Sequence, residues 1–496
     1  MFTKGFDNDK YISLQSSKIK ERISLFGEKL YIEFGGKLFD DFHAARVLPG
    51  FAPDSKIRML TQIKDEAEII IAINTTDIEK NKVRGDLGIT YDLDVLRLID
   101  AFRGNGLYVG SVVMTRYKDT PAAASFKQKL EGLGITVYKH FQIEGYPHNI
   151  PHIVSNNGFG ANEYIKTERP VVIVTAPGPG SGKMATCLSQ IYHESKKGIK
   201  SGYAKFETFP IWNLPLNHPV NLAYEAATAD LADVNMIDPF HLDAYGQLAV
   251  NYNRDVEVFP VLRSMLAEIL GECPYKSPTD MGVNMVGNCI YDDDAVSCAA
   301  KQEIIRRYYA ALCKMRQDGG GHEAEIEKIE LLMRKISCDP VLDRKCVSYA
   351  TEKSEATSSP AVAIELSDGR IVTGKTSNLL GASSAALINA LKAIAGIDHD
   401  IDLISHEILA PIQVLKINNL GNHNPRLHTD EVLIALAISA VDDPRARAAM
   451  AAIPKLKNTE VHSTVILSQV DAGTFRKLGM NLSCSPQYQT KKLFHR

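Results

Sequence analysis

The stretch VVIVTAPGPGSGKMATCLSQ, residues 171–190, predicts a buried strand, a turn rich in glycine and proline, and then a helix. β-Branched residues favour strands, and glycines let successive backbone N–H groups point toward one anion. A helix that starts directly after such a turn carries a partial positive charge at its first residues. This order of elements is typical of a phosphate-binding turn.

The turn departs from the usual phosphate-loop pattern at two of its eight positions. The pattern is G-x-x-x-x-G-K-[ST], whereas residues 177–184 read PGPGSGKM. Pro177 and Pro179 lack an amide donor, but the amides expected to wrap a phosphate, from Gly180 to Met184, are intact. Met184 lacks the hydroxyl that normally binds Mg²⁺ in such loops. The predicted ligand-binding residues are Gly178, Gly180, Ser181, Gly182, Lys183 and Met184. The alternative is an ordinary turn with a solvated Lys183.

A second stretch matches the same pattern without exception, but in a different context. GRIVTGKT, residues 369–376, lies within AVAIELSDGRIVTGKTS, where two β-rich runs flank Asp368-Gly369. Asp-Gly favours a tight hairpin turn. Because residues 370–372 look like the second strand of this hairpin, no strand delivers the match and no room is left for a phosphate cradle, so we expect no nucleotide site.

Strand-like and helix-like runs alternate through the first half of the chain. The predicted strands are residues 29–34, 68–74, 107–114, 135–141, 170–176 and 201–207, and helix-like stretches such as 92–106 and 122–134 separate them. This alternation predicts an α/β fold with a three-layer, mainly parallel sheet.

The pattern then changes twice along the chain. Residues 256–336 carry apolar residues at three- and four-residue spacing, which predicts amphipathic helices. The hairpin and further helices follow, and Asp443-Pro444 is typical of a helix start. We therefore predict an α/β domain with the phosphate-loop-like turn over 1–255, a helical subdomain over 256–338 and a C-terminal α+β domain over 339–496.

Two carboxylates are candidates for chemistry beside the turn. Glu207 ends the next predicted strand, so a parallel sheet places it at the same edge as the turn, where it could accept a proton during phosphoryl transfer. Asp238 follows a short strand-like run and is the predicted Mg²⁺ ligand. The predicted catalytic residues are thus Lys183, Glu207 and Asp238. A surface position for Glu207 and a helix-capping role for Asp238 remain alternatives.

Further polar side chains follow the predicted strands and are candidates for substrate contact. One group comes directly after the first strand, a second lies in the proline-rich stretch between Glu207 and Asp238, and Arg254 follows later and could close over a phosphate from the helical part. They are Lys37, Asp41, His43, Arg46, Trp212, His218 and Arg254. Solvated charges and packed loop residues are the alternatives for each.

Histidine patterns give little support for a metal enzyme. The His-Glu pairs at 193–194, 322–323 and 406–407 are not followed by a second histidine at the spacing of H-E-x-x-H, so a zinc protease of that type is not supported. His423 and His428 lie in a polar turn before a predicted helix, and they are the only basis for placing a site in the C-terminal region.

Composition limits the classes of partner. A chain of 496 residues with 45% hydrophobic residues is long enough for two or three cores. The net charge of -3 and a pI near 6.5 do not favour nucleic acid. No apolar run reaches the length of a membrane span, and the N-terminal residues lack a secretory signal, so we expect cytoplasmic location. The eight cysteines form no C-x-x-C pair.

Four segments together resemble a known group of proteins. The segments KLYIEFGGKLFDDFHAARVLPGF, TAPGPGSGKMATCLSQIYHE, YAKFETFPIWNLPLNHPVNLAYEAATADL and VNMIDPFHLDAYG are similar to the uncharacterised bacterial domain-of-unknown-function family 1846. The resemblance covers nearly the whole chain and implies no established activity. Some members are labelled ATP-dependent zinc proteases, but the missing H-E-x-x-H argues against the protease part of that label.

These observations lead to two hypotheses of different classes. The first is an enzyme that binds ATP or another phosphate-bearing ligand at Gly178–Lys183 and transfers a phosphoryl group, with Mg²⁺ left open as a cofactor. The second is a regulatory protein that senses a phosphate ligand without turnover, which the missing hydroxyl at Met184 favours. The expected partner is a small-molecule phosphate ligand, and a homo-oligomer is left open.

Overall fold

The computed structural model describes residues 4–84, 88–231 and 233–489. The chain forms two compact units. Among the described residues, the N-terminal unit contains Gly5–Tyr224 and Asp233–Val296, and the C-terminal unit contains Lys4 and residues 225–231 and 297–489. Neither unit is therefore a continuous stretch of chain. The outer limits of the predicted domains, residues 1 and 496, lie outside the described residues.

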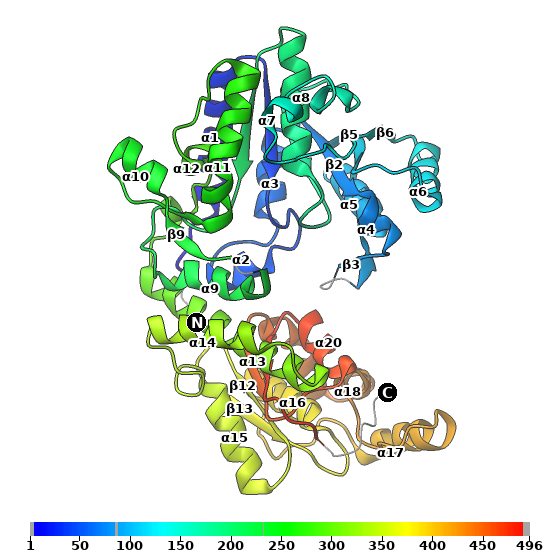
Figure 1. Ribbon diagram of the computed structural model, residues 1–496. Helices are drawn as coiled ribbons and strands as arrows, with labels where there is room; N and C mark the ends of the chain where they lie inside the picture. Colours follow the sequence, from blue (N-terminus) through cyan, green and yellow to red (C-terminus); the bar gives the residue numbers. More distant parts are fainter. Residues whose placement is uncertain (1–3, 85–87, 232, 490–496) are drawn as a thin grey trace. The chain divides into compact units, whose positions relative to one another are not determined.

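A seven-stranded parallel sheet forms the centre of the N-terminal unit (Figure 1). Its order is β11-β8-β1-β7-β2-β5-β6. The strands are β1 (Lys29–Phe34), β2 (Ala67–Asn74), β5 (Tyr108–Thr115), β6 (Thr136–Lys139), β7 (Val171–Thr175), β8 (Ser201–Phe206) and β11 (Gly282–Val283). The predicted α/β fold with a mainly parallel sheet is confirmed. Every residue of β2 and β7 is buried, because neighbouring strands and helices cover both of their faces.

Helices connect these strands. They are α1 (Asn8–Phe26), α2 (Phe42–Val47), α3 (Ser55–Gln62), α4 (Thr75–Glu79), α5 (Tyr91–Gly104), α6 (Pro121–Gly132), α7 (Ile150–Ile153), α8 (Lys183–Lys196), α9 (Pro219–Ala227), α10 (Pro239–Tyr245), α11 (Asn253–Leu270) and α12 (Pro278–Met281). Two antiparallel pairs lie outside this sheet: β3 (Val83–Arg84) pairs with β4 (Ile89–Thr90), and β9 (Asn235–Ile237) pairs with β10 (Val250–Tyr252).

The hydrophobic core beneath α8 explains why the turn before it has a fixed place. Val172 and Val174 of β7 pack against Cys187, Leu188 and Ile191 of α8. Phe259, Leu262 and Leu266 of α11 extend the same cluster. The helix that follows the turn is therefore held against the sheet by buried apolar side chains.

The C-terminal unit is built on a four-stranded mixed sheet of order β13-β12-β14-β15. Its strands are β12 (Ala361–Glu365), β13 (Ile371–Lys375), β14 (Glu460–Ser463) and β15 (Asn481–Cys484). Its helices are α13 (Asp293–Asp318), α14 (Glu323–Lys335), α15 (Lys345–Thr357), α16 (Ala382–Ala395), α17 (His406–Val414), α18 (Thr429–Ser439), α19 (Pro444–Ala451) and α20 (Gln469–Lys477), with a π-helical segment η4 (Leu415–Asn419) after α17. The predicted hairpin over 361–377 and the Asp443 cap are confirmed.

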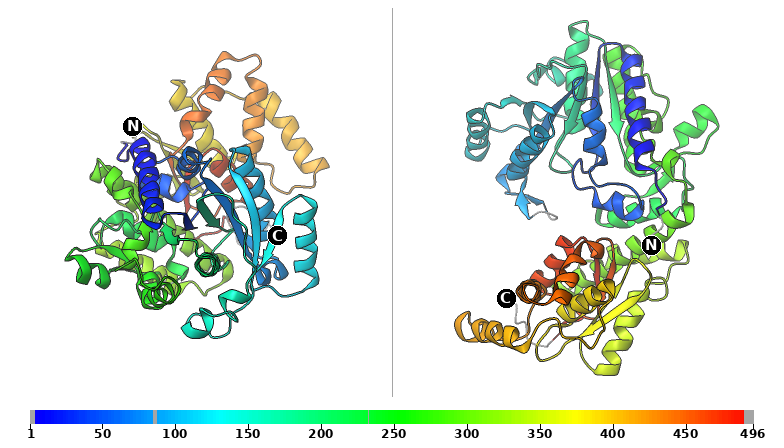
Figure 2. Two further views of the ribbon diagram at one scale, coloured as in Figure 1. Left: turned by 90° about the horizontal axis from the view of Figure 1, so that it is seen from above. Right: turned by 180° about the vertical axis from the view of Figure 1, so that it is seen from behind.

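The helices predicted over 256–338 form, but they are divided between the two units. α11 and α12 lie in the N-terminal unit, whereas most of α13 and all of α14 lie in the C-terminal unit. The two further views in Figure 2 show the same elements from above and from behind. Among the described residues, no helix combines the length and apolar character needed to cross a bilayer.

Candidate functional site

The turn before α8 lies at the carboxyl end of a central strand. β7 pairs with β1 on one side and β2 on the other, so the turn emerges in the middle of the sheet edge. Gly180 and Gly182 have φ angles of 74° and 84°, in the left-handed region that favours glycine. The sheet therefore delivers a turn whose backbone conformation depends on these two glycines.

The backbone amides of this turn are available for a ligand. In the part of the chain that the structure describes, the amides from Gly180 to Met184 donate to no acceptor. The carbonyl groups, in contrast, are used: Ser181 Oγ donates to the Gly178 carbonyl over 2.8 Å, and Thr115 Oγ1 donates to the Ser181 carbonyl over 2.7 Å. The turn is thus fixed through its oxygens, which leaves its N–H groups unpaired at the start of a 14-residue helix.

Neighbouring side chains support one side of the turn and leave the other open. A Cβ on Gly178 would overlap the Tyr91 hydroxyl, and a Cβ on Gly182 would lie 3.0 Å from Thr115 Cγ2. No described atom lies within 4 Å of a Cβ built on Gly180. The protein's own side chains therefore do not fill the space beside Gly180.

Lys183 and Met184 differ in their surroundings. Burial raises the pKa of the Cys187 thiol, Glu33 raises it further and Lys183 lowers it. No carboxylate among the described residues lies within ion-pair distance of Lys183. Met184 instead packs against the apolar core that contains Val174. Packing contacts thus replace the hydroxyl that the usual pattern would supply at 184.

Glu207 belongs to a buried cluster of charged groups at the end of β8. Lys205 Nζ lies 2.6 Å from Glu207 Oε1 and also contacts Asp255 Oδ2, which comes from the first turn of α11. Burial raises the pKa of Glu207 to about 8, and the nearby Asp255 adds to that rise although Lys205 opposes it. Burial acts against the charge of Lys205 too, but Asp255 and Glu207 outweigh it and raise the Lys205 pKa. Glu207 is therefore poised to exchange a proton near neutral pH.

A small cavity adjoins Glu207. It has a volume of about 20 Å³ and is lined by Glu207, Pro210, Trp212, Val250, Asn251, Thr279, Gly282 and Asn284. The Trp212 indole Nε1 donates to the Asn284 carbonyl over 3.0 Å, which fixes the ring in the wall. Two residues selected from the sequence, Glu207 and Trp212, thus line one cavity.

Asp238 occupies a structural position. Its Oδ1 accepts from the His241 amide over 3.1 Å, which caps α10, and its Oδ2 accepts from Thr279 Oγ1 over 2.6 Å and from the Thr279 amide. Asp238 is fully buried, and the three donors are bound to its two carboxylate oxygens. Within the described ranges, no three His, Cys, Asp or Glu side chains are grouped so as to hold a metal ion. The metal-binding role of Asp238 stays a prediction, which the three donors to its carboxylate do not support.

The segment after β1 is held by its own contacts. Asp41 caps α2 through the Ala44 amide and forms a buried ion pair of 2.7 Å with Lys56. Burial favours neutral Asp41, but Lys56 outweighs it and keeps the Asp41 pKa below its usual range. The His43 ring packs edge-on against the rings of Phe209 and Tyr224. Lys37 lies in the loop and Arg46 in the last turn of α2, at the same sheet edge.

His218 and Arg254 also have structural partners. His218 Nε2 lies 2.9 Å from Asp293 Oδ1, and its Nδ1 accepts from the Val220 amide at the start of α9. Arg254 donates to Asp233 over 2.7 Å. The substrate roles predicted for these residues stay predictions.

Sequence reasoning missed three residues of the site. Glu33 of β1 lies opposite Lys205 of β8 in the sheet register, and the Tyr203 hydroxyl donates to Glu33 over 2.8 Å. Asp255, which lies 50 positions after Lys205 in the chain, reaches the cluster from α11. The charged residues Glu33 and Lys205 inside apolar strands were a usable signal, because a charge at a buried strand end needs a partner.

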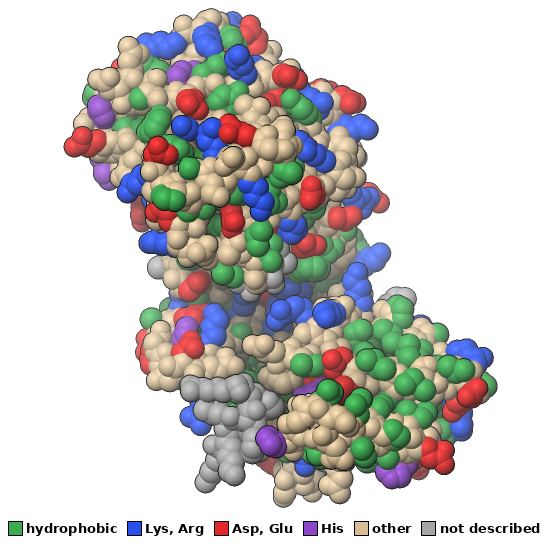
Figure 3. Space-filling model, turned by 90° about the vertical axis from the view of Figure 1, so that its right-hand side faces the viewer, with side chains coloured by type: hydrophobic (Ala, Val, Ile, Leu, Met, Phe, Trp, Pro, Cys, Tyr) green, Lys and Arg blue, Asp and Glu red, His purple; other side chains and the backbone are tan. Residues whose placement is uncertain are grey.

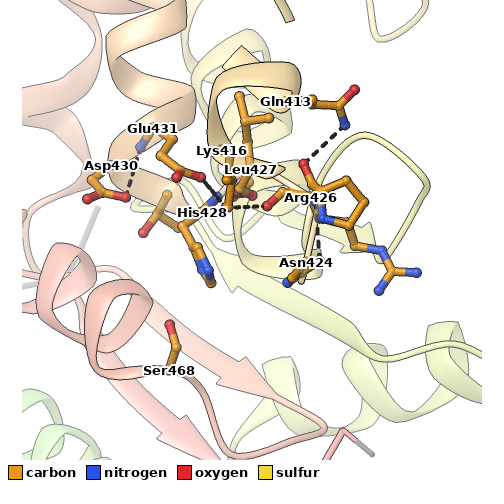
Figure 4. A network of polar contacts seen from close by, with 12 residues as sticks. Gln413, Lys416, Asn424, Arg426, Leu427, His428, Asp430, Glu431 and Ser468 are labelled. Carbon is orange, nitrogen blue, oxygen red and sulfur yellow. Dashed lines mark hydrogen bonds and ion pairs between the residues drawn. The ribbon is translucent and has the colours of Figure 1, made fainter. Parts of the chain in front are cut away.

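His428 of the C-terminal unit takes part in a network of polar contacts at the start of α18 (Figure 4). His428 Nδ1 lies 3.1 Å from Asp471 Oδ2, and the His428 amide donates to Glu431 Oε2 over 2.7 Å. Lys416 Nζ donates to the same carboxylate oxygen over 2.6 Å. His423, in contrast, is exposed. The network joins the start of α18 to α20 and to the segment after α17.

Comparisons with known proteins agree along the whole chain. Residues 4–337 match the domain of unknown function DUF1846, N-terminal, and residues 342–494 match its C-terminal counterpart. The chain is 57% identical over 496 residues to a UPF0371 protein of Streptococcus thermophilus strain CNRZ 1066, with 100% of both chains covered. It is 56% identical, with the same coverage, to a UPF0371 protein of Streptococcus pneumoniae strain Hungary19A-6. The chain therefore belongs to the DUF1846 family, whose relatives named here carry no assigned activity.

Proposed function

We propose that the turn from Gly178 to Met184 binds the phosphate group of a nucleotide such as ATP or of another phosphorylated metabolite. The observation that carries this proposal is the run of amides from Gly180 to Met184 that have no acceptor among the described residues. Unpaired amides at a helix start favour an anion, since the helix dipole and the N–H groups act in the same direction.

Lys183 and the open side of the turn support the same proposal. Lys183 has no carboxylate partner within the described residues, so its charge is available to a phosphate. Space beside Gly180 gives a ligand access to the amides. Charge neutralisation by Lys183 and the helix start needs no divalent metal, which agrees with the apolar packing of Met184.

Phosphoryl transfer is the reaction that we propose for the enzyme hypothesis. An acceptor hydroxyl would give its proton to Glu207 while its oxygen bonds to phosphorus and the bond to the leaving oxygen breaks. A pKa of about 8 suits Glu207 to this role, because its ionised form is accessible near neutral pH. β1 lies between β7 and β8, so about 10 Å separates the two strand ends at the usual strand spacing. The acceptor would extend across the end of β1.

The alternative is a phosphate-sensing protein without turnover. Met184 favours it, because the position that usually supplies a metal-binding hydroxyl is packed into the core instead. Turnover separates the two functions. Product formation that disappears in Glu207→Gln while ligand binding persists identifies an enzyme, whereas binding without product identifies a sensor.

Binding measurements on a matched pair of lysine variants test the phosphate site. Lys183 and Lys375 occupy the same position of the two pattern matches, but Lys375 ends a strand of the hairpin. Calorimetric titration with ATP, GTP and sugar phosphates, with and without Mg²⁺, should identify at least one compound that binds. We expect Lys183→Ala to weaken its affinity by about 100-fold, or about 2.7 kcal/mol, and Lys375→Ala to leave it unchanged. Equal affinities in both variants would exclude the turn as the site.

A further inference from the structure

The C-terminal unit exposes a group of apolar side chains on α17, on η4 and α18, and on the residues that directly follow η4 and α18 (Figure 3). Their exposed fractions range from 51% to 70%. They are Val414, Leu415, Leu420, Ile434, Ile438 and Val441, and we call them the apolar face. Single exposed apolar residues are normal, but a group on adjoining elements marks an interaction surface.

α18 is apolar on both sides, which a helix at a free surface is not. Val432, Ala435 and Leu436 pack into the core of the unit, while Ile434 and Ile438 lie on the opposite, exposed side. Residues 432–441 include no charged side chain. A helix that is hydrophobic all round is normally covered all round, so the exposed side of α18 calls for a partner.

α17 and η4 extend this surface. Figure 1 shows α17 at the margin of the C-terminal unit, and only Leu409 within α17 is buried. The one charged residue between Ile408 and Leu420 is Lys416, which is buried and paired with Glu431 over 2.6 Å. That ion pair anchors the segment while Val414, Leu415 and Leu420 remain outside the core. Short helices with so few contacts are marginal alone.

We infer that the apolar face binds the same face of a second copy of this chain. Six side chains exposed by more than half present on the order of 500 Å² of apolar surface. A stable dimer buries about 800 Å² per partner, of which about 65% is apolar, so the apolar face supplies about what a dimer needs. An uncharged surface is complementary to itself, and a two-fold axis pairs identical surfaces.

The chemistry of the apolar face argues against a lipid surface as its partner. Helices that lie on membranes carry lysine and arginine along their polar side. α17 has no lysine or arginine, and the lysine of η4 is buried. A second copy needs no such charges. The inference concerns a surface that is independent of the proposed phosphate site.

Sedimentation velocity over a range of concentrations tests the inference on the full chain. We expect a species of twice 54.6 kDa for the unmodified protein at micromolar concentration. The double variant Leu420→Glu with Ile438→Glu should dissociate into monomers, with a dissociation constant at least 100-fold higher. Leu342→Glu is the matched control, because Leu342 is 78% exposed in the same unit but lies outside the apolar face. This control should remain a dimer.

Hydrogen exchange of the unmodified protein covers the case in which the double variant fails to fold. Amides of residues 414–420 and 434–441 should become protected as the concentration rises through the dissociation constant. A protein that is a monomer at all concentrations would overturn the inference. So would a dimer that persists in the double variant and on dilution, if residues 414–420 and 434–441 show no protection.

Discussion

The two matches to the phosphate-loop pattern differ in what their backbone amides do. Residues 369–376 match every position, yet β13 is paired with β12 from Ile371 to Lys375, and the Thr376 amide donates to the Pro360 carbonyl. Residues 177–184 miss two positions, yet no described acceptor takes the amides from Gly180 to Met184. The letters of a motif therefore matter less than whether the fold leaves its donors unpaired.

Gly374 shows how differently glycine is used in the complete match. A Cβ at this position would overlap the amide nitrogen of Ala386, because β13 packs closely on α16. We expect Gly374→Ala to destabilise the C-terminal unit by about 3 kcal/mol through overpacking, with phosphate binding unchanged. Urea unfolding and ligand titration measure the two effects. Loss of binding without loss of stability would break the comparison, since it would give the hairpin a ligand role.

Glu207 lies at the same sheet edge as residues 177–184, the incomplete match, and its pKa is raised. The complete match, residues 369–376, belongs to a different sheet. Folding favours the protonated form of Glu207, whose pKa is about 8. Its contribution to stability is therefore present below the ordinary glutamate pKa and is lost as pH rises through about 8, by at most about 1.4 kcal/mol per pH unit. We expect the melting temperature of the unmodified protein to fall more between pH 5 and pH 8 than that of Glu207→Gln. Parallel curves for the two proteins would contradict the raised pKa.

Completing the pattern at position 184 gives the smallest effect. Met184→Thr supplies the missing hydroxyl but removes side-chain packing against the core, which should cost about 1 kcal/mol of stability. We expect unchanged ligand affinity and no gain of Mg²⁺ dependence, because the described residues gather no set of carboxylates for a metal. Titrations with and without Mg²⁺ measure this. A tenfold gain in affinity that requires Mg²⁺ would show that the letters of the pattern decide after all.

Local patterns predicted much of the fold. The six strands expected from apolar runs appear within about two residues of their predicted ends, as with residues 135–141 and β6 (Thr136–Lys139). Such runs are visible because burial of a strand determines its composition locally. β11 has only two residues, so its composition carried no signal. The division of the helices over 256–338 between two units depends on tertiary packing, which periodicity does not record.

The candidate site was predictable only in part. Glu207 and the turn share a sheet edge because both follow parallel strands, and this placement follows from the fold class. The ion pair of Lys205 with Asp255 joins residues 50 positions apart, and nothing local predicts it. For Asp238 the sequence left helix capping and metal binding open, and the cap is present. The contact of Asp238 with Thr279 of α12, 41 positions away, could not be predicted from the sequence, and the metal-binding role stays a prediction.

The discontinuous division of the chain has a practical consequence for dissecting the protein. The segment Glu225–Ala232 belongs to the C-terminal unit, although the N-terminal unit flanks it in sequence. Its short helix Ala229–Leu231 contacts α14. A gene fragment that stops at residue 296 would contain the helix Ala229–Leu231 without its partner α14. A fragment that starts at residue 297 would lack that helix and would expose the face of α14 that the helix contacts. A single cut of the chain therefore cannot yield both units intact.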